Sequence, residues 1–151
     1  MQNFPLVSVI CLSYNHEAYV VEALNSVINQ TYPNIELLIA DDCSSDNSIG
    51  VIKDWVKNHP EVHFSTNEKN LGNTKTFNQL AKIAKGEFII DLAADDLLVP
   101  NCIEKQVTTF QNSKYKNLGI VYGNLIEIDK NGNFLNNYYN EEDRPESGDI
   151  Y

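Results

Sequence analysis

The sequence has little positive charge. Its 151 residues include 11 Lys and Arg against 21 Asp and Glu, which gives a formal net charge of −10 at pH 7. Nucleic acids and anionic lipid surfaces bind proteins through basic patches, which a chain with this charge balance is poorly suited to present. We therefore exclude nucleic-acid binding as a leading function. The excess of carboxylates favours solubility or a site that holds metal cations.

Cysteines and long apolar runs are also scarce. The three cysteines, Cys11, Cys43 and Cys102, lie far apart in the sequence and form neither a disulfide framework nor a CxxC metal pattern. No apolar run approaches the roughly 18 residues of a membrane span, and residues 1–5 lack the basic segment of a signal peptide. These absences predict a cytoplasmic protein with no transmembrane segment in this chain. Peripheral attachment to the inner face of a membrane stays compatible with them.

Glycine-rich phosphate loops are absent as well. No GxGxxG follows the first predicted strand, and no GxxxxGKS/T occurs anywhere in the chain. A dinucleotide site or a P-loop nucleotide site is therefore not expected. The composition is otherwise that of a folded protein, with 42% hydrophobic residues, and a chain of this length is expected to form one domain with a substantial core.

Two hydrophobic periodicities alternate along the chain. Nearly continuous β-branched runs, typical of strands buried on both faces, are followed by segments with apolar residues at helical spacing. The predicted strands are 6–12, 35–40, 62–66, 87–92 and 118–123, and the predicted helices are 18–30, 49–56, 77–84 and 103–110. We expect Gly86 to end the third helix and Asn131-Gly132 to form a type I′ turn in a hairpin over 125–135. This alternation predicts an α/β fold, with a parallel sheet and helices on both faces.

Polar residues gather where the predicted strands end, and parallel sheets bind their ligands at that edge. Ser13-Tyr14-Asn15 follows the first strand, Asp41-Asp42 the second and Asp95-Asp96 the fourth. Carboxylates that converge repel one another unless a cation compensates. Mg²⁺ and Mn²⁺ take one or two protein carboxylates and complete their shells with phosphate oxygens and water. The pattern therefore favours a metal-chelated diphosphate as the ligand.

Simpler readings of these residues remain open. Asp at a strand-to-helix turn caps the following helix, which applies to Asp41, Asp42 and the pair Asp95-Asp96, and Tyr14 can merely seal the edge of the core. A receiver-like signalling module is also an α/β sheet with Mg²⁺-binding carboxylates. It needs an acidic pair after the first strand and a phosphorylatable Asp after the third, and this chain has neither.

Four segments resemble the successive signatures of family-2 glycosyltransferases with a GT-A fold: VSVICLSYN, QTYPNIELLIADDCSSDNS, NLGNTKTFN and KGEFIIDLAADDLLVP. They cover residues 5–100 in the family's order, and the IDKNG hairpin adds weaker support. The resemblance implies a Rossmann-like, mostly parallel sheet with helices on both faces and a C-terminal β-hairpin. It also implies inverting transfer of a sugar from a nucleotide sugar, with help from a divalent metal. UDP- and dTDP-sugars are the favoured donors, and a cell-surface glycan or a lipid-linked molecule is the expected acceptor.

The resemblance also assigns roles at the nucleotide end. Leu12, Ser13 and Tyr14 match the family's nucleotide-contacting turn, in which Tyr14 would lie against the base or ribose. Asp42 matches the carboxylate that accepts a hydrogen bond from the ring N–H of the pyrimidine.

At the diphosphate end, Asp95 and Asp96 match the family's acidic motif. Asp95 would face the ribose, and Asp96 would bind Mn²⁺ or Mg²⁺ on the diphosphate. The family often has Asp-x-Asp-Asp, whereas here Ala93 stands first, so one contact is lost. This departure favours the alternative of a non-catalytic nucleotide-sugar-binding or assembly domain.

The resemblance finally sets an expectation for the domain. We expect residues 1–151 to form a single GT-A domain, with the nucleotide-sugar-binding core in 1–100 and the start of the acceptor half in 101–151. In similar proteins the general base follows the hairpin region. We therefore expect the domain to be truncated at its C-terminus, with the catalytic base outside the chain, and this fragment alone to transfer sugar poorly or not at all.

Overall fold

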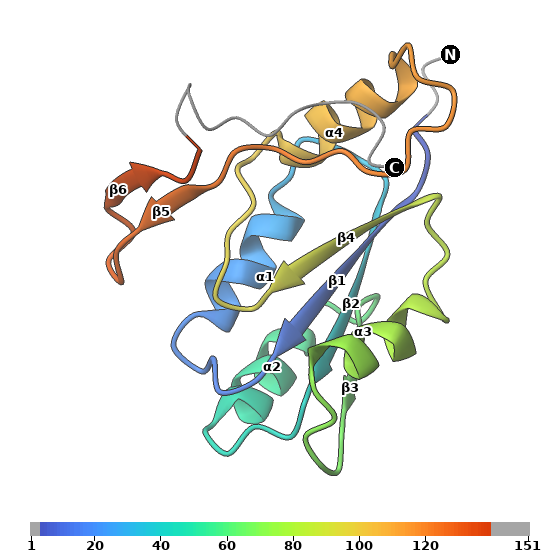
Figure 1. Cartoon of the computed structure of the whole chain (residues 1–151). Helices are drawn as coiled ribbons and strands as arrows, with labels where there is room; N and C mark the ends of the chain where they lie inside the picture. The colour runs from blue at the N-terminus through green and yellow to red at the C-terminus, as the bar shows by residue number, and fades with distance from the viewer. Residues whose placement is uncertain (1–3, 140–151) are drawn as a thin grey trace. The chain divides into compact units, whose positions relative to one another are not determined.

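The computed structural model describes residues 4–139 (Figure 1). These residues fall into two compact units, which divide between Thr108 and Thr109. The first unit is built on a four-stranded parallel sheet in the order β3-β2-β1-β4. Its strands are β1 (Val7–Ser13), β2 (Ile35–Asp41), β3 (His63–Thr66) and β4 (Phe88–Ala93). The helices are α1 (Val20–Ile28), α2 (Ser48–Val56), α3 (Asn73–Ala81) and α4 (Cys102–Gln111), the last of which runs into the second unit.

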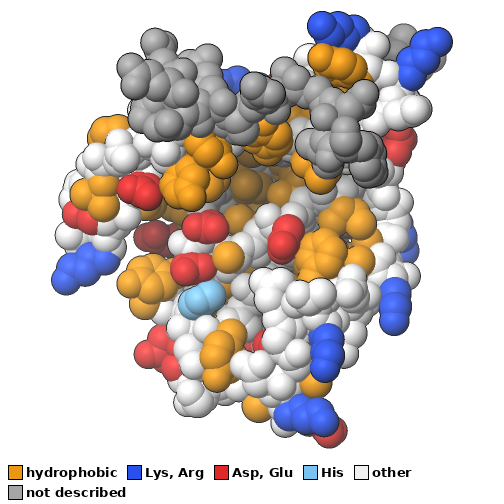
Figure 2. Space-filling model, in the orientation of Figure 1, with side chains coloured by type: hydrophobic (Ala, Val, Ile, Leu, Met, Phe, Trp, Pro, Cys, Tyr) orange, Lys and Arg blue, Asp and Glu red, His pale blue; other side chains and the backbone are white. Residues whose placement is uncertain are grey.

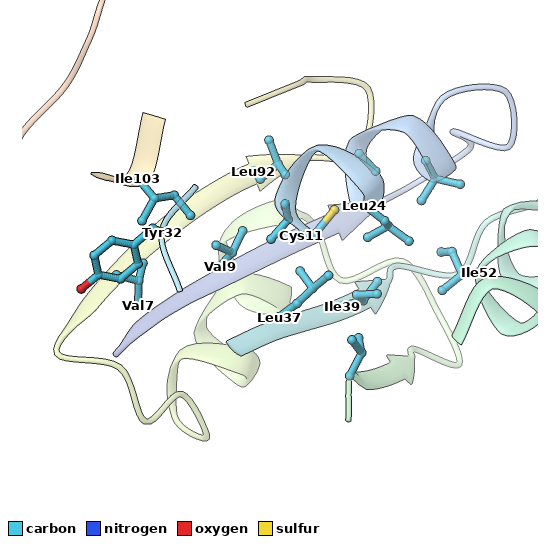
Figure 3. Packing of buried hydrophobic residues seen from close by; sticks show 14 of the residues in the cluster. Val7, Val9, Cys11, Leu24, Tyr32, Leu37, Ile39, Ile52, Leu92 and Ile103 are labelled. Atoms are coloured by element: carbon cyan, nitrogen blue, oxygen red, sulfur yellow. The ribbon is translucent and has the colours of Figure 1, made fainter. Parts of the chain in front are cut away.

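Strand β1 is buried along its whole length because apolar side chains cover both faces of the sheet. Its alternate residues Val7, Val9 and Cys11 pack with α1, α2 and α4 in the larger core cluster, part of which Figure 3 shows. Ile10 and Leu12 point to the opposite face and pack with α3. This two-sided burial explains the unbroken apolar run of β1. The predicted α/β fold, with helices on both faces of a parallel sheet, is confirmed.

The predicted end of the third helix is wrong. Helix α3 ends at Ala81, and Gly86 is not its C-terminal cap. Instead, the Gly86 N–H donates to Ser8 Oγ at 2.8 Å and to Glu36 Oε1 at 3.1 Å. A Cβ at position 86 would lie 2.5 Å from the backbone nitrogen of Ser8. Glycine is therefore required here by the close approach of two backbones.

The second unit contains the predicted hairpin but not the predicted strand before it. Strands β5 (Ile126–Ile128) and β6 (Phe134–Asn137) pair antiparallel, whereas residues 118–123 form no strand. The turn is also not type I′, because Gly132 has a positive φ of 81° and Asn131 does not. The carboxylate of Asp129 accepts hydrogen bonds from the backbone N–H groups of Asn131 and Asn133, and this loop geometry replaces the tighter turn.

None of the helices within residues 4–139 is both long enough and apolar enough to cross a membrane.

Candidate functional site

The ends of three neighbouring strands lie side by side at the carboxyl edge of the sheet. Ser13 at the end of β1 is level with Asp41 of β2, and Leu12 is level with Ala93 at the end of β4. Two further hydrogen bonds continue this alignment into the turns, from Asp42 N to Ser13 O at 2.9 Å and from Ala94 N to Leu12 O at 2.9 Å. The fold therefore brings together the three turns that carry the candidate residues.

The residues of the first turn have different environments. Leu12 belongs to the core, so its side chain offers nothing to a ligand, while its carbonyl oxygen holds the β4 turn. Ser13 is only 1% exposed, and its Oγ has no hydrogen-bond partner within the described residues. Tyr14, in contrast, is 45% exposed. An exposed ring beside a buried polar strand end is suited to stacking against a planar ligand.

Asn15 gives the first turn its shape. It adopts a positive φ of 60°, in the left-handed region that Asn tolerates better than most residues. Its N–H donates to Ser44 Oγ at 2.9 Å, and its Oδ1 accepts from the Ser45 N–H at 2.8 Å. Ser44 in turn donates to the fully buried Asp41 through both its N–H and its hydroxyl. Asp41 thus anchors the turns after β1 and β2. It does not cap the following helix, because α2 begins at Ser48 with Asn47 as its N-cap.

Asp42 points to the other face of the sheet, where it binds the start of α3. Its Oδ1 accepts from Asn67 Nδ2 and from the Leu71 N–H, both at 2.8 Å, and its Oδ2 accepts from the Gly72 N–H at 2.7 Å. Burial alone would raise the pKa of Asp42, which is 6% exposed, but these hydrogen bonds outweigh it and hold the pKa below its usual value. The Thr76 side chain also contributes a hydrogen bond that lowers this pKa, so the carboxylate is held in place from several sides.

Asp95 and Asp96 follow β4 in a tight turn, in which the Asp96 N–H donates to Ala93 O at 3.0 Å. Both are exposed, and the imidazole Nε2 of His16 lies 3.8 Å from Asp95 Oδ2. Figure 2 shows acidic side chains gathered beside a histidine. Partial burial and the neighbouring charge of Asp95 raise the pKa of Asp96, whereas His16 opposes that shift. Two adjacent carboxylates whose charges disfavour each other are a donor pair that a divalent cation would neutralise.

The acidic pair fits a metal ion that is shared between the protein and the phosphates of a ligand. The described part of the chain contains no cluster of three or more His, Cys, Asp or Glu side chains placed to hold a metal. Mg²⁺ is commonly held by one or two carboxylates together with phosphate oxygens of the substrate. Asp95 and Asp96 suit that arrangement and not a closed cage made of protein ligands.

Sequence reasoning missed His16 as part of this cluster. Its backbone N–H donates to Ser48 Oγ at 2.8 Å, and its carbonyl accepts from the N–H groups of Tyr19 and Val20 as α1 begins. Its ring Nδ1 is buried without a partner among the described residues. The sequence did contain a signal for His16: SYNHE and SSDNS are both rich in polar residues and both follow strands that end at the same edge.

Comparisons with known proteins agree with this arrangement. Residues 8–148 match the model of a family described as Glycosyl transferase family 2. Chondroitin synthase of Escherichia coli is 34% identical over 140 residues, which is 93% of this chain and 20% of that protein. The UDP-Glc:alpha-D-GlcNAc-diphosphoundecaprenol beta-1,3-glucosyltransferase WfgD of Escherichia coli is 36% identical over 126 residues, 83% of this chain and 48% of its own length.

A solved structure gives the same result for the fold. S. aureus TarS 1-349 in complex with UDP-GlcNAc superposes with a TM-score of 0.65 and 26% identity, covering 78% of this chain and 37% of that one. The chain therefore spans less than half of the length of each of these three proteins.

Proposed function

Since the chain belongs to glycosyl transferase family 2, we propose that it is the donor-binding part of an enzyme that transfers a sugar from a nucleotide sugar to an acceptor. The observation that carries the proposal is that the turns bearing Tyr14, Asp42 and the pair Asp95-Asp96 lie side by side at the carboxyl edge of one parallel sheet. We further propose a single displacement with inversion, assisted by a divalent metal ion.

For the nucleoside, we assign recognition to the turns after β1 and β2. The exposed ring of Tyr14 would lie against the base or ribose, next to the backbone of Leu12 and Ser13. Asp42 would accept the ring N–H of a pyrimidine on Oδ2. Support for this role comes from the fixed position of the carboxylate and from the hydrogen bonds that favour its charged form.

For the diphosphate, we assign the turn after β4. Asp96 would hold Mn²⁺ or Mg²⁺ together with the donor's phosphate oxygens, and Asp95 would face the ribose. A divalent ion so held supplies positive charge that stabilises the leaving nucleoside diphosphate. The chain's own contribution is the placement of two carboxylates that disfavour each other without a cation. Ala93 contributes no carboxylate to this group.

The names of the relatives guide the choice of donor and acceptor. WfgD is named for a UDP-Glc donor and a diphosphoundecaprenol-linked acceptor, and the TarS structure holds UDP-GlcNAc. We propose a UDP-sugar as donor, with dTDP-sugars next, and a lipid-linked molecule or cell-surface glycan as acceptor, in polysaccharide biosynthesis. We also propose a cytoplasmic site of action at the inner face of a membrane, in keeping with three free cysteines.

We propose that donor binding resides in residues 1–100 and that residues 101–151 begin the acceptor half. No residue of this chain is assigned as the general base. One observation favours a second function, a non-catalytic nucleotide-sugar-binding or assembly domain: Ala93 occupies a position where the family often has Asp. Membership of glycosyl transferase family 2 argues against the receiver-like alternative.

Thermal-shift titrations of UDP, dTDP and GDP, each with and without Mn²⁺, test the proposal. We expect metal-dependent stabilisation by UDP, of about 2.7 kcal/mol at 100 times the dissociation constant. Asp96→Ala should remove the metal dependence, and Asp91→Ala, which changes a carboxylate within β4, serves as the matched control. If Asp96→Ala binds Mn²⁺–UDP as well as the parent does, the assignment is wrong. Mn²⁺-dependent hydrolysis of UDP-sugars then separates an enzyme from a binding domain.

A further inference from the structure

The side chain of Gln30 joins three segments of the first unit. Its Nε2 donates to Val99 O at 2.8 Å and to Ser26 O at 3.0 Å, and lies 3.5 Å from Leu98 O. Its Oε1 accepts from the Ile103 N–H at 3.1 Å. Every contact pairs a donor with an acceptor, and the reversed amide would pair none of them. Gln30, two residues after the end of α1, is thus bound both to the segment after the acidic pair and to the start of α4.

Neighbouring residues strengthen this connection. Ser26 Oγ accepts from the Leu98 N–H at 3.1 Å, and the Thr31 N–H donates to Pro100 O at 2.8 Å. The Thr31 hydroxyl donates to the carboxylate of Glu104 at 2.8 Å. Residues 98–104 are therefore held along their length against the end of α1, which lies about seventy residues earlier in the sequence.

On its other side, the acidic pair is held by the sheet. Ala94 is fully buried, and its N–H donates to Leu12 O of β1. Only residues 95–97 lie between this fixed point and Leu98, so Asp95 and Asp96 sit on a short bridge with both ends anchored. Release of the Leu98 end would leave the turn attached to the sheet on one side only.

We propose that Gln30 is a positioning residue for the Asp95–Asp96 turn, fixing where these carboxylates meet the metal and diphosphate of the donor. The inference rests on the proposed function, since it takes Asp96 as the metal-binding residue. Gln30 acts through the Leu98–Val99 backbone and touches no ligand itself. Small displacements of groups that orient a substrate weaken its binding strongly, so a side chain that holds this backbone in place is expected to affect the metal-dependent part of nucleotide binding.

The variant Gln30→Glu tests this role with little change in shape. It replaces the donor group Nε2 by a carboxylate oxygen, which the carbonyls of Val99 and Ser26 repel, while the other oxygen still accepts from Ile103. Thr31→Val is the matched control. It changes the residue next to Gln30 and removes only the hydrogen bond from the Thr31 hydroxyl to Glu104. The measurements are the dissociation constant of UDP with Mn²⁺, that of UDP alone and the thermal midpoint.

We expect Gln30→Glu to weaken Mn²⁺-dependent UDP binding about ten-fold or more, with metal-free UDP binding changed less than about two-fold and Thr31→Val like the parent. A Gln30→Glu chain with a lower thermal midpoint but unchanged Mn²⁺–UDP affinity would show a purely structural role and overturn the inference. If Gln30→Glu does not fold, Gln30→Met carries the same test. If the parent binds no Mn²⁺–UDP, the proposed function fails and the inference with it. If the parent binds Mn²⁺–UDP, Asp96→Ala loses the metal dependence and Gln30→Glu keeps it, the inference about Gln30 is refuted while the proposed function stands.

Discussion

Asp42 should stabilise the folded chain through its charge, whatever it does for a ligand. Replacing it by Asn keeps the size of the side chain but leaves only one acceptor oxygen. If that oxygen keeps the bonds from Asn67 and Leu71, the new amide NH₂ faces the Gly72 N–H, donor against donor. The variant loses one hydrogen bond to a charged acceptor and leaves one buried donor unpaired. Together these changes should lower the free energy of unfolding by about 2–3 kcal/mol. For a chain of this size the thermal midpoint should fall by roughly 4–12 °C.

The effect of Asp42→Asn should depend on pH in one direction. The pKa of Asp42 is held below its ordinary value of 3.8 in the folded chain, so the folded state favours the charged form. The stabilisation is therefore fully present above about pH 5 and is lost as the pH falls through the folded pKa. Urea unfolding of the parent and of Asp42→Asn, from neutral pH down to about pH 3, should show two curves that converge in acid.

Asp91→Asn is the control for this experiment. Asp91 lies in β4, and burial raises its pKa, so its charge opposes folding at neutral pH. The control variant should therefore be as stable as the parent at pH 7, or more stable. Equal stability of Asp42→Asn and the parent at pH 7, or a gap that stays constant down to pH 3, would refute the reasoning about Asp42.

Two further substitutions test the site and the fold. Tyr14→Ala should weaken UDP binding by about 1–3 kcal/mol if the ring stacks on the base, whereas Tyr14→Phe should keep the affinity of the parent. Calorimetric titration with UDP measures the three affinities, and equal values for the parent and both variants would exclude stacking. Gly86→Ala should lower the free energy of unfolding by about 1–3 kcal/mol, because its Cβ meets the backbone of Ser8, and urea unfolding without such a loss would contradict the close approach.

The strands of the sheet were predictable because burial on both faces leaves a clear pattern in the sequence. The segment from Val7 to Leu12 is apolar except for Ser8, and such a continuous apolar run is typical of a central strand in a parallel sheet. The positions of the acidic pairs at the ends of β2 and β4 were predictable for a related reason, since parallel strands end at one edge. Local pattern and topology therefore predicted where the candidate site lies.

Contacts between distant segments were beyond that reasoning. Helical spacing continues to Ala84, but Gly86 must approach Ser8 and Glu36, and α3 ends at Ala81. Three donors to Asp42 come from residues 25 to 30 positions later in the chain. The contact of Gln30 with Val99 joins residues that are about seventy positions apart. No spacing rule encodes such pairs, because side-chain hydrogen bonds depend on how the loops meet in the folded chain.

The central place of β1 has a consequence for how the chain is made. β1 pairs with β2 nearby, but its other partner is β4, with Val7 opposite Phe88. At roughly 5–20 residues per second, a ribosome completes β4 about 4–16 s after β1 has been synthesised. During that interval one edge of a mostly apolar strand has no partner. This is the condition under which chaperones bind nascent chains and strands associate wrongly. The strand that is buried at every position in the folded chain is thus the one that waits for its second partner until most of the sheet has been synthesised.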